Sequence, residues 1–145
     1  MTQPTLTVEL IPETSFFKNV RSHVTQREWD KIRESVFKAA GHRCEICNGQ
    51  GKKHPVECHE IWEYNNNIQK LIGLIALCPS CHLVKHFGLA QVLGKSKTAY
   101  KHLKKVNKWD DQTTDLHIQN AFSLWEERNL VKWELDLTYL ENYEY

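Results

Sequence analysis

Two pairs of cysteines, each with two residues between its members, constrain this chain more than any other feature. The first pair is Cys44 and Cys47, and the second is Cys78 and Cys81, with thirty residues between the pairs. Zn²⁺ prefers four thiolate ligands in a tetrahedron, and the two-residue spacing lets both sulfurs of a pair reach one ion from a tight turn. The sequence therefore predicts a structural zinc site that joins the two ends of this stretch.

Three histidines beside the cysteines are not needed by a four-cysteine site. The proline inside the second cysteine pair suits the first turn of a helix, and such a helix places His82 and His86 four residues apart on one face. Two imidazoles at that spacing can share a divalent ion. Strands are predicted for 55–62, which contains His59, and for 72–77. A strand–strand–helix unit whose two ends are joined by the zinc ion would bring the imidazoles of His59, His82 and His86 together.

The stretch from residue 44 to residue 88 resembles the ββα-metal core of the HNH endonuclease family, in the form that carries a four-cysteine zinc. The match rests on the letters HEI at 59–61 and LCPSCHLVKH at 77–86. The resemblance implies a ββα-metal core, and with the flanking helices and short terminal strands predicted below the expected fold class is α+β. It also implies that a second divalent ion, Mg²⁺, Mn²⁺, Ni²⁺ or Zn²⁺, is bound by His59, His82 and His86.

The resemblance further implies a reaction, the metal-dependent hydrolysis of phosphodiester bonds in DNA, which we expect to be double-stranded. The catalytic residues would be Glu60, His59 and His82. Two positions depart from the family pattern, because Glu60 replaces the general-base histidine and Gly73 replaces an asparagine. A glutamate beside a metal can still deprotonate water. The alternatives are an HNH-fold zinc protein that is catalytically impaired and binds DNA or a protein partner, and a purely structural domain.

Three regions are expected along the chain. Residues 1–43 would supply a strand at 6–10 and a helix that packs on the core, the 44–88 stretch would be the zinc-clipped core, and 89–145 would be a C-terminal extension. The N-terminal helix should begin after Thr25, whose side chain forms a capping box with Glu28 three residues on.

The C-terminal extension is predicted to contain a basic helix, an amphipathic helix and a strand. Thr114 is the expected cap of the amphipathic helix at 115–130, and alternating apolar residues predict the strand at 133–139. We expect this last strand to pair with the strand at 6–10, which would bring the two ends of the chain together.

Lysines are concentrated after the core. Residues 85–108 contain seven lysines and no acidic residue, and most of the lysines fall on the predicted basic helix. Such a face can bind a phosphate backbone through counterion release, although a solvated helix face has the same composition. The predicted nucleic-acid contacts are Lys85, Lys97, Lys101, Lys104, Lys105 and Lys108.

Composition limits the other possibilities. The net charge of +1 excludes polyanion binding by bulk charge alone. We expect no membrane span, because no apolar run is long enough, and no signal peptide. Four of the five cysteines are paired as metal ligands, which is typical of reduced thiols and of a cytoplasmic protein. Cys58, the fifth, is expected to be a small core residue.

Overall fold

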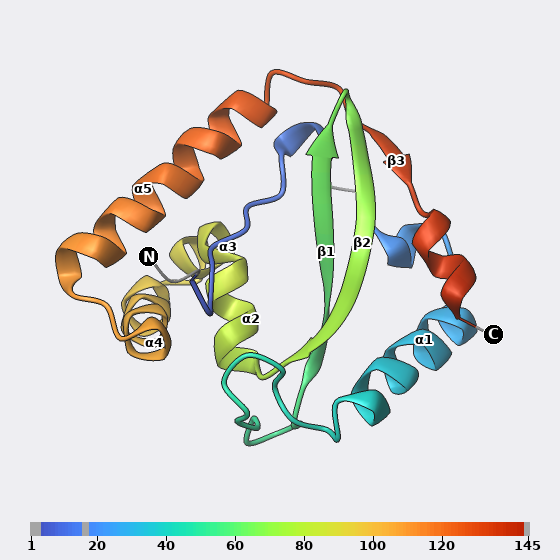
Figure 1. Cartoon of the computed structure of the whole chain (residues 1–145), viewed down its shortest axis with the longest axis horizontal. Helices are drawn as coiled ribbons and strands as arrows, with labels where there is room; N and C mark the ends of the chain where they lie inside the picture. The colour runs from blue at the N-terminus through green and yellow to red at the C-terminus, as the bar shows by residue number, and fades with distance from the viewer. Residues whose placement is uncertain (1–3, 16–17, 144–145) are drawn as a thin grey trace.

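The computed structural model describes residues 4–15 and 18–143, and these residues form a mixed α+β fold (Figure 1). Its centre is an antiparallel hairpin of β1 (Glu57–Asn65) and β2 (Ile68–Leu77), which leads directly into α2 (Pro79–Lys85). The predicted order of two strands and a helix is therefore confirmed, and both strands are longer than predicted. The three histidines discussed above lie on β1 (His59), on α2 (His82) and at the C-cap of α2 (His86).

The hairpin turns at Asn66 and Asn67, whose φ angles of 50° and 64° lie in the left-handed region. Two-residue hairpin turns of this kind need positive φ at both positions, and asparagine tolerates it better than other residues with a side chain. The register pairs His59 with Ile75, and it shifts between Ile61 and Trp62. The asparagine turn and the register shift together fix which side chains of β1 face α2.

The third strand, β3 (Glu134–Asp136), lies parallel to the start of β2 and gives the sheet order β1-β2-β3. A strand at 133–139 was expected, and only three of these residues form it. Its predicted pairing with residues 6–10 is wrong, because β3 pairs with β2 and the 6–10 segment forms no strand.

The N-terminal segment runs extended between α5 and the hairpin, as the dark blue trace in Figure 1 shows. It makes hydrogen bonds to helices instead of a strand ladder. The amide of Asn107 accepts from the backbone N–H groups of Thr5 and Leu6 and donates to the Leu6 carbonyl, and His117 accepts from the N–H of Val8 at 3.0 Å. Side chains therefore satisfy backbone groups that a neighbouring strand would otherwise have satisfied.

Helix α1 (Gln26–Ala39) begins where predicted, with the reciprocal capping box between Thr25 and Glu28. Its buried face contacts inward-facing residues of β1 and β2, and forms one core cluster with them. The neighbouring side chains of the strands, such as Leu77, point to the opposite face and belong to a second cluster with Val84 of α2. The hairpin thus lies between α1 and α2.

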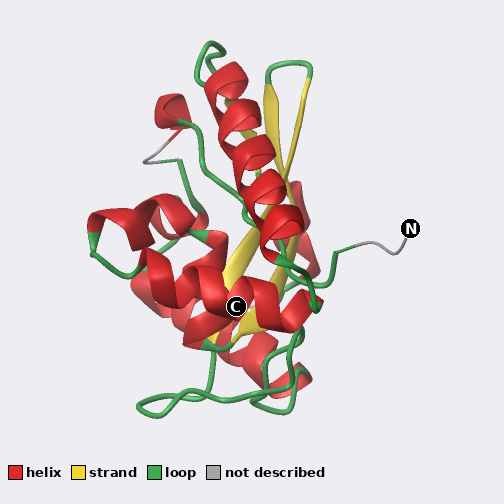
Figure 2. Cartoon of the chain, turned by 90° about the vertical axis from the view of Figure 1, so that its left-hand side faces the viewer, coloured by secondary structure: helices red, strands yellow, loops and turns green. Residues whose placement is uncertain are grey.

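Three further helices complete this second cluster: α3 (Phe87–Val92), α4 (Ser96–Asn107) and α5 (Asp111–Arg128). Figure 2 shows the helices of the C-terminal half lying in front of the hairpin strands. The predicted cap of the last helix is wrong. Asp110 is the N-cap, and Thr114 is buried within the first turns with its hydroxyl donating to the Asp110 carbonyl.

Short 3₁₀ segments occur at Glu13–Ser15 (η1), Val20–Ser22 (η2) and Thr138–Asn142 (η3). None of the helices in the described part of the chain combines the length and apolar character that a membrane crossing requires.

Asn107 tests whether the N-terminal segment is held by the C-terminal extension. We expect Asn107→Ala to lower the free energy of unfolding by about 1–3 kcal/mol, because it removes the partner of the partly buried N–H and carbonyl groups of Leu6, and of the exposed N–H of Thr5. Urea denaturation measures the change, and Asn120→Ala, at an exposed position of α5, is the control. Equal stability of the two variants would contradict this role.

Candidate metal centres

The four paired cysteines converge on one point. Their sulfurs all lie within 4.8 Å of one another, and three of the four residues are buried. The sulfurs of Cys47 and Cys78 are 3.6 Å apart. Two thiolates on one tetrahedral zinc ion, with bonds of about 2.3 Å, would be about 3.8 Å apart. The predicted ligand set Cys44, Cys47, Cys78 and Cys81 is therefore brought together, and this site could hold a metal ion such as zinc.

Hydrogen bonds reach the sulfurs from the backbone and from within the cluster, and without a metal ion they favour the thiolate at Cys44 while the pKa values of Cys78 and Cys81 are raised. The N–H groups of Gly49 and Cys81 donate to the sulfurs of Cys47 and Cys78 at 3.4 Å each. A hydrogen bond from the Cys81 thiol contributes most to lowering the pKa of Cys44, to about 4.

Gly51 allows the loop between the first cysteine pair and β1 to close, since a Cβ there would lie 2.3 Å from the His54 carbonyl oxygen.

Cys58 lies outside this cluster, on the face of β1 that packs against α1. Burial raises the pKa of its thiol to about 12, so the thiol stays protonated at neutral pH and is a poor metal ligand. Cys58 was predicted to be a small core residue, and the structure shows it partly buried and packed against the core cluster of α1 and the hairpin.

The three predicted histidines also converge, from β1 (His59) and from α2 and its C-terminal end (His82 and His86). Their donor nitrogens lie within 4.8 Å of one another. The Nε2 atoms of His82 and His86 are 3.2 Å apart, close to the roughly 3.3 Å expected for two imidazoles on one tetrahedral ion. Burial lowers the pKa of His59 and, with the neighbouring imidazoles, lowers that of His86 to about 3. Both are therefore neutral at pH 7, as metal ligands must be.

A carboxylate contacts each of two of these rings, Glu57 that of His82 and Glu9 that of His59. Oε1 of Glu57 lies 2.9 Å from Nδ1 of His82, which leaves Nε2 of that ring directed toward His86. The second oxygen of Glu57 lies 2.8 Å from Nε2 of His54. Burial by itself would raise the pKa of Glu57, and the hydrogen bonds from the two histidines outweigh it and lower the pKa.

Glu9 is a residue of this site that the sequence does not reveal. Its Oε2 lies 3.4 Å from Nε2 of His59 and 2.5 Å from Nζ of Lys85. Burial opposes ionisation, yet the hydrogen bond from His59 and the charge of Lys85 lower the pKa of Glu9 to about 2. No sequence spacing relates residue 9 to residue 59, because only the path of the N-terminal segment brings them together.

The same contacts place Lys85 in the protein interior. Its side chain is 7% exposed, and its ammonium group contacts Glu9 and the Thr7 hydroxyl. Lys85 was predicted to contact nucleic acid, and its burial is at odds with such a contact. Its charge instead holds the N-terminal segment beside the histidines.

Glu60 was the predicted catalytic base, and its described hydrogen bond is to the backbone N–H of Val20 at 2.8 Å. Strand alternation turns its side chain away from His59 and toward η2. Burial raises its pKa. Gly73, which replaces the family asparagine, lies opposite Ile61 in the ladder, where a Cβ would be 3.3 Å from the Ile61 side chain.

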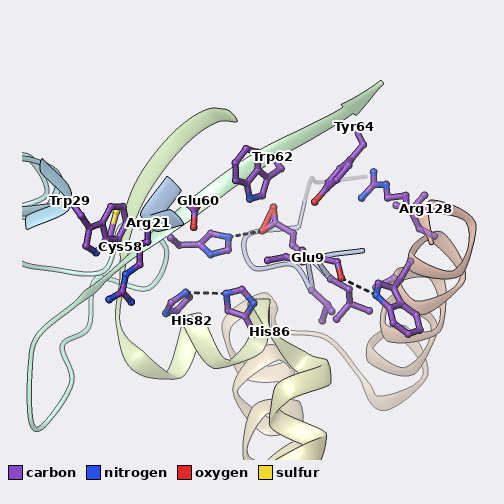
Figure 3. Close-up of a pocket in the computed structure, with 17 residues that line it drawn as sticks. Glu9, Arg21, Trp29, Cys58, Glu60, Trp62, Tyr64, His82, His86 and Arg128 are labelled. Carbon is purple, nitrogen blue, oxygen red and sulfur yellow. Dashed lines mark hydrogen bonds and ion pairs between the residues drawn. The ribbon is translucent and has the colours of Figure 1, made fainter. Parts of the chain in front are cut away.

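A cavity of about 400 Å³ opens beside the histidines (Figure 3). It is lined by the three histidines, by two of the three glutamates discussed above, by aromatic side chains and by two arginines. Those that bear on chemistry are Glu9, Arg21, His59, Glu60, His82, His86 and Arg128.

The predicted lysine face is on α4, away from this cavity. Lys97, Lys101 and Lys105 are exposed, while Lys104 forms an ion pair with Asp111 at 2.9 Å. Lys108 is the exposed C-cap residue of the helix. None of these lysines lines the cavity that contains the histidines. Helix α4 meets α2 on its cysteine side, where Nε2 of His102 lies 3.1 Å from the Cys81 sulfur.

Comparison with protein-family models, with curated proteins and with solved structures finds no match to this chain. The chemistry of the site is therefore inferred from its own residues.

Removing one sulfur tests the first centre. We expect Cys81→Ser to lose one zinc ion per chain and to unfold, because structural zinc binding contributes directly to folding. Elemental analysis of dialysed protein and far-ultraviolet circular dichroism give the readout, and Cys58→Ser should retain both metal and fold. Full zinc content in Cys81→Ser would contradict the assignment.

Proposed function

We propose that this protein is a metal-dependent endonuclease of the HNH type, which hydrolyses phosphodiester bonds in DNA. The observation that supports this most strongly is the convergence of His59, His82 and His86 from a hairpin and the following helix, directly beside a four-cysteine cluster. This is the same order of elements and ligands that the sequence resemblance to HNH endonucleases implies.

In this proposal the four cysteines bind a structural zinc ion. The ion would link the loop that contains Cys44 to the start of α2 at Cys78. Because His82 and His86 lie one and two turns further along the same chain segment, a fixed start of α2 also fixes the direction of their rings. The zinc would thus position the active site without taking part in the reaction.

The three imidazoles would hold the second ion, which is Mg²⁺, Mn²⁺, Ni²⁺ or Zn²⁺. When bound, such an ion polarises a scissile phosphate and stabilises the leaving oxygen. Glu57 keeps Nε2 of His82 free for this purpose by engaging its Nδ1. Glu9 contacts His59 and helps to set the position of that ring.

Of the two glutamates in the cavity, Glu60 suits the role of general base better. It occupies the sequence position of the family's base and lines the same cavity as the histidines. Glu9, held by Lys85 and His59, is a much weaker base because its pKa is about 2. Glu60 would accept the proton of the attacking water, whereas Glu9 would retain its charge throughout.

A second candidate function is a DNA-binding or protein-interaction module with the same zinc-clipped core. The hydrogen bond of Glu60 to the Val20 backbone favours it, because a carboxylate already engaged there is less available to water. Gly73 also favours a module without catalysis, because it lacks the amide side chain of the asparagine that HNH endonucleases have at this position. DNA would be the partner of the enzyme and of a DNA-binding module, both in the cytoplasm, and binding without cutting would distinguish that module from the enzyme.

The second metal can be counted separately from the first. We expect wild-type protein to take up one Ni²⁺ or Mn²⁺ ion in addition to zinc, and His86→Ala to lose that ion alone, since its ring supplies one of three ligands. Isothermal titration and elemental analysis measure both ions. Unchanged uptake by His86→Ala would exclude a shared histidine site.

Cleavage tests the reaction. We expect wild-type protein to cut plasmid DNA when divalent ions are added, and Glu60→Gln to lower the rate by on the order of 10²–10⁴, the usual contribution of a general base. His59→Ala should abolish the metal stimulation. His42→Asn, at an exposed position with positive φ that asparagine tolerates, is the control. Absence of metal-stimulated cutting by the wild type would reject the nuclease and leave the binding module.

A further inference from the structure

Two arginines from distant parts of the chain line the cavity beside the histidines. Arg21 comes from η2, before the core, and Arg128 is the last residue of α5. Figure 3 shows them on opposite sides of the pair formed by His82 and His86. No sequence pattern marks either residue, because each reaches the cavity only through the packing of its own element.

Two contacts, one with α1 and one with β1, position Arg21 and the 3₁₀ turn that carries it. The guanidinium lies 5.9 Å from the centre of the Trp29 ring of α1. The backbone N–H of Val20, the preceding residue, donates to Glu60 of β1, so the 3₁₀ turn that carries Arg21 is attached to the strand that carries His59. This gives Glu60 a positioning role in addition to the base role proposed above.

Arg128 is held in a similar way on the other side. Its guanidinium stacks 4.2 Å from the centre of the Tyr64 ring, and Tyr64 in turn packs edge-on against Trp133. Burial lowers the pKa of Arg128, and arginine still remains charged at neutral pH. An aromatic platform leaves the edge of a guanidinium, with its N–H donors, free to meet an anion.

Carboxylates interact with these arginines only at longer range in the described part of the chain, Glu60 with Arg21, and Glu127 and Glu9 with Arg128. Among residues 4–15 and 18–143, no carboxylate lies within ion-pair distance of either guanidinium. The two acidic residues of the cavity are engaged elsewhere, Glu9 with Lys85 and Glu60 with the Val20 backbone. The cavity therefore presents to an entering ligand two guanidinium groups that form no ion pair with a described carboxylate, and that of Arg128 is oriented by its stacking on Tyr64.

We propose that Arg21 and Arg128 bind nucleic-acid phosphates on the two sides of the histidine centre, and that the lysines of α4 do not. This inference rests on the proposed function and adds the residues that hold the substrate. Planar guanidinium groups bind phosphate oxygens in a bidentate manner. Cations on both sides of the reacting position suit a polynucleotide strand, which carries phosphates before and after the scissile one, better than they suit a mononucleotide.

The position of α4 supports this assignment. Helix α4 packs on the cysteine side of α2, whereas His82 and His86 face β1 on the other side. A strand bound along Lys97, Lys101 and Lys105 would therefore not be placed across the histidines. The acidic partner of Lys104 reduces the charge of that face further.

The salt dependence of DNA binding tests the proposal. A fluorescent duplex oligonucleotide is titrated with protein by anisotropy at several salt concentrations, with no divalent ion added. We expect Arg21→Gln and Arg128→Gln each to weaken binding roughly tenfold and to reduce the slope of log K against log salt by about 1, since each removes one phosphate contact. In Arg21→Lys and Arg128→Lys the positive charge is kept and the bidentate geometry is lost. These variants should therefore recover most of the salt slope and less of the affinity.

Lys101→Gln and Lys105→Gln on α4 are the matched controls, and we expect them to leave affinity and slope unchanged. Ni²⁺ uptake by all variants shows that the histidine centre is intact. If the lysine variants lose slope while the arginine variants bind like wild type, the arginine assignment is wrong and the proposed nuclease stands. If wild-type protein neither binds nor cuts DNA, the proposed function itself fails.

Discussion

The arrangement of this protein depends on the link between the Cys44–Cys47 loop and the start of α2. Sulfurs from both sides converge within 4.8 Å of one another, and Cys78 is also the residue that caps α2. A metal ion shared by four thiolates would hold a hairpin and one short helix in a fixed relation that their small apolar contact could not ensure alone. The three imidazoles would then converge as a direct consequence, since His82 lies on α2, His86 caps its C-terminal end and His59 belongs to the hairpin.

The N-terminal and C-terminal segments complete the cavity beside the three histidines. The N-terminal segment carries Glu9 to His59, and it is held in place by the buried ammonium of Lys85 and by the side chains of Asn107 and His117. The C-terminal extension therefore stabilises the site, although its helices supply none of the three histidines. Its last turn of α5 adds Arg128 to the cavity wall. Removal of either end of the chain would open the cavity on one side.

Features that depend on local sequence could be predicted. The spacing of the cysteines, the proline that begins α2 and the capping box of Thr25 each reflect interactions over four residues or fewer, and the structure contains all of them. The convergence of His59 with His82 and His86 was expected from the strand–strand–helix order, but other features that depend on tertiary packing could not be predicted. The strand pairing of β3, the burial of Lys85 and the approach of Glu9 to His59 join residues far apart in sequence, and alternation or charge content carries no information about such partners.

Anomalous X-ray scattering from crystals of zinc-containing protein soaked in Ni²⁺ tests the central claim most directly. We expect a zinc peak equidistant from the sulfurs of Cys44, Cys47, Cys78 and Cys81, at about 2.3 Å, and a separate nickel peak within about 2.1 Å of nitrogens of His59, His82 and His86. A zinc peak without all four sulfurs, or the absence of any peak between the three imidazoles, would contradict a thiolate-bound ion that organises a histidine metal site.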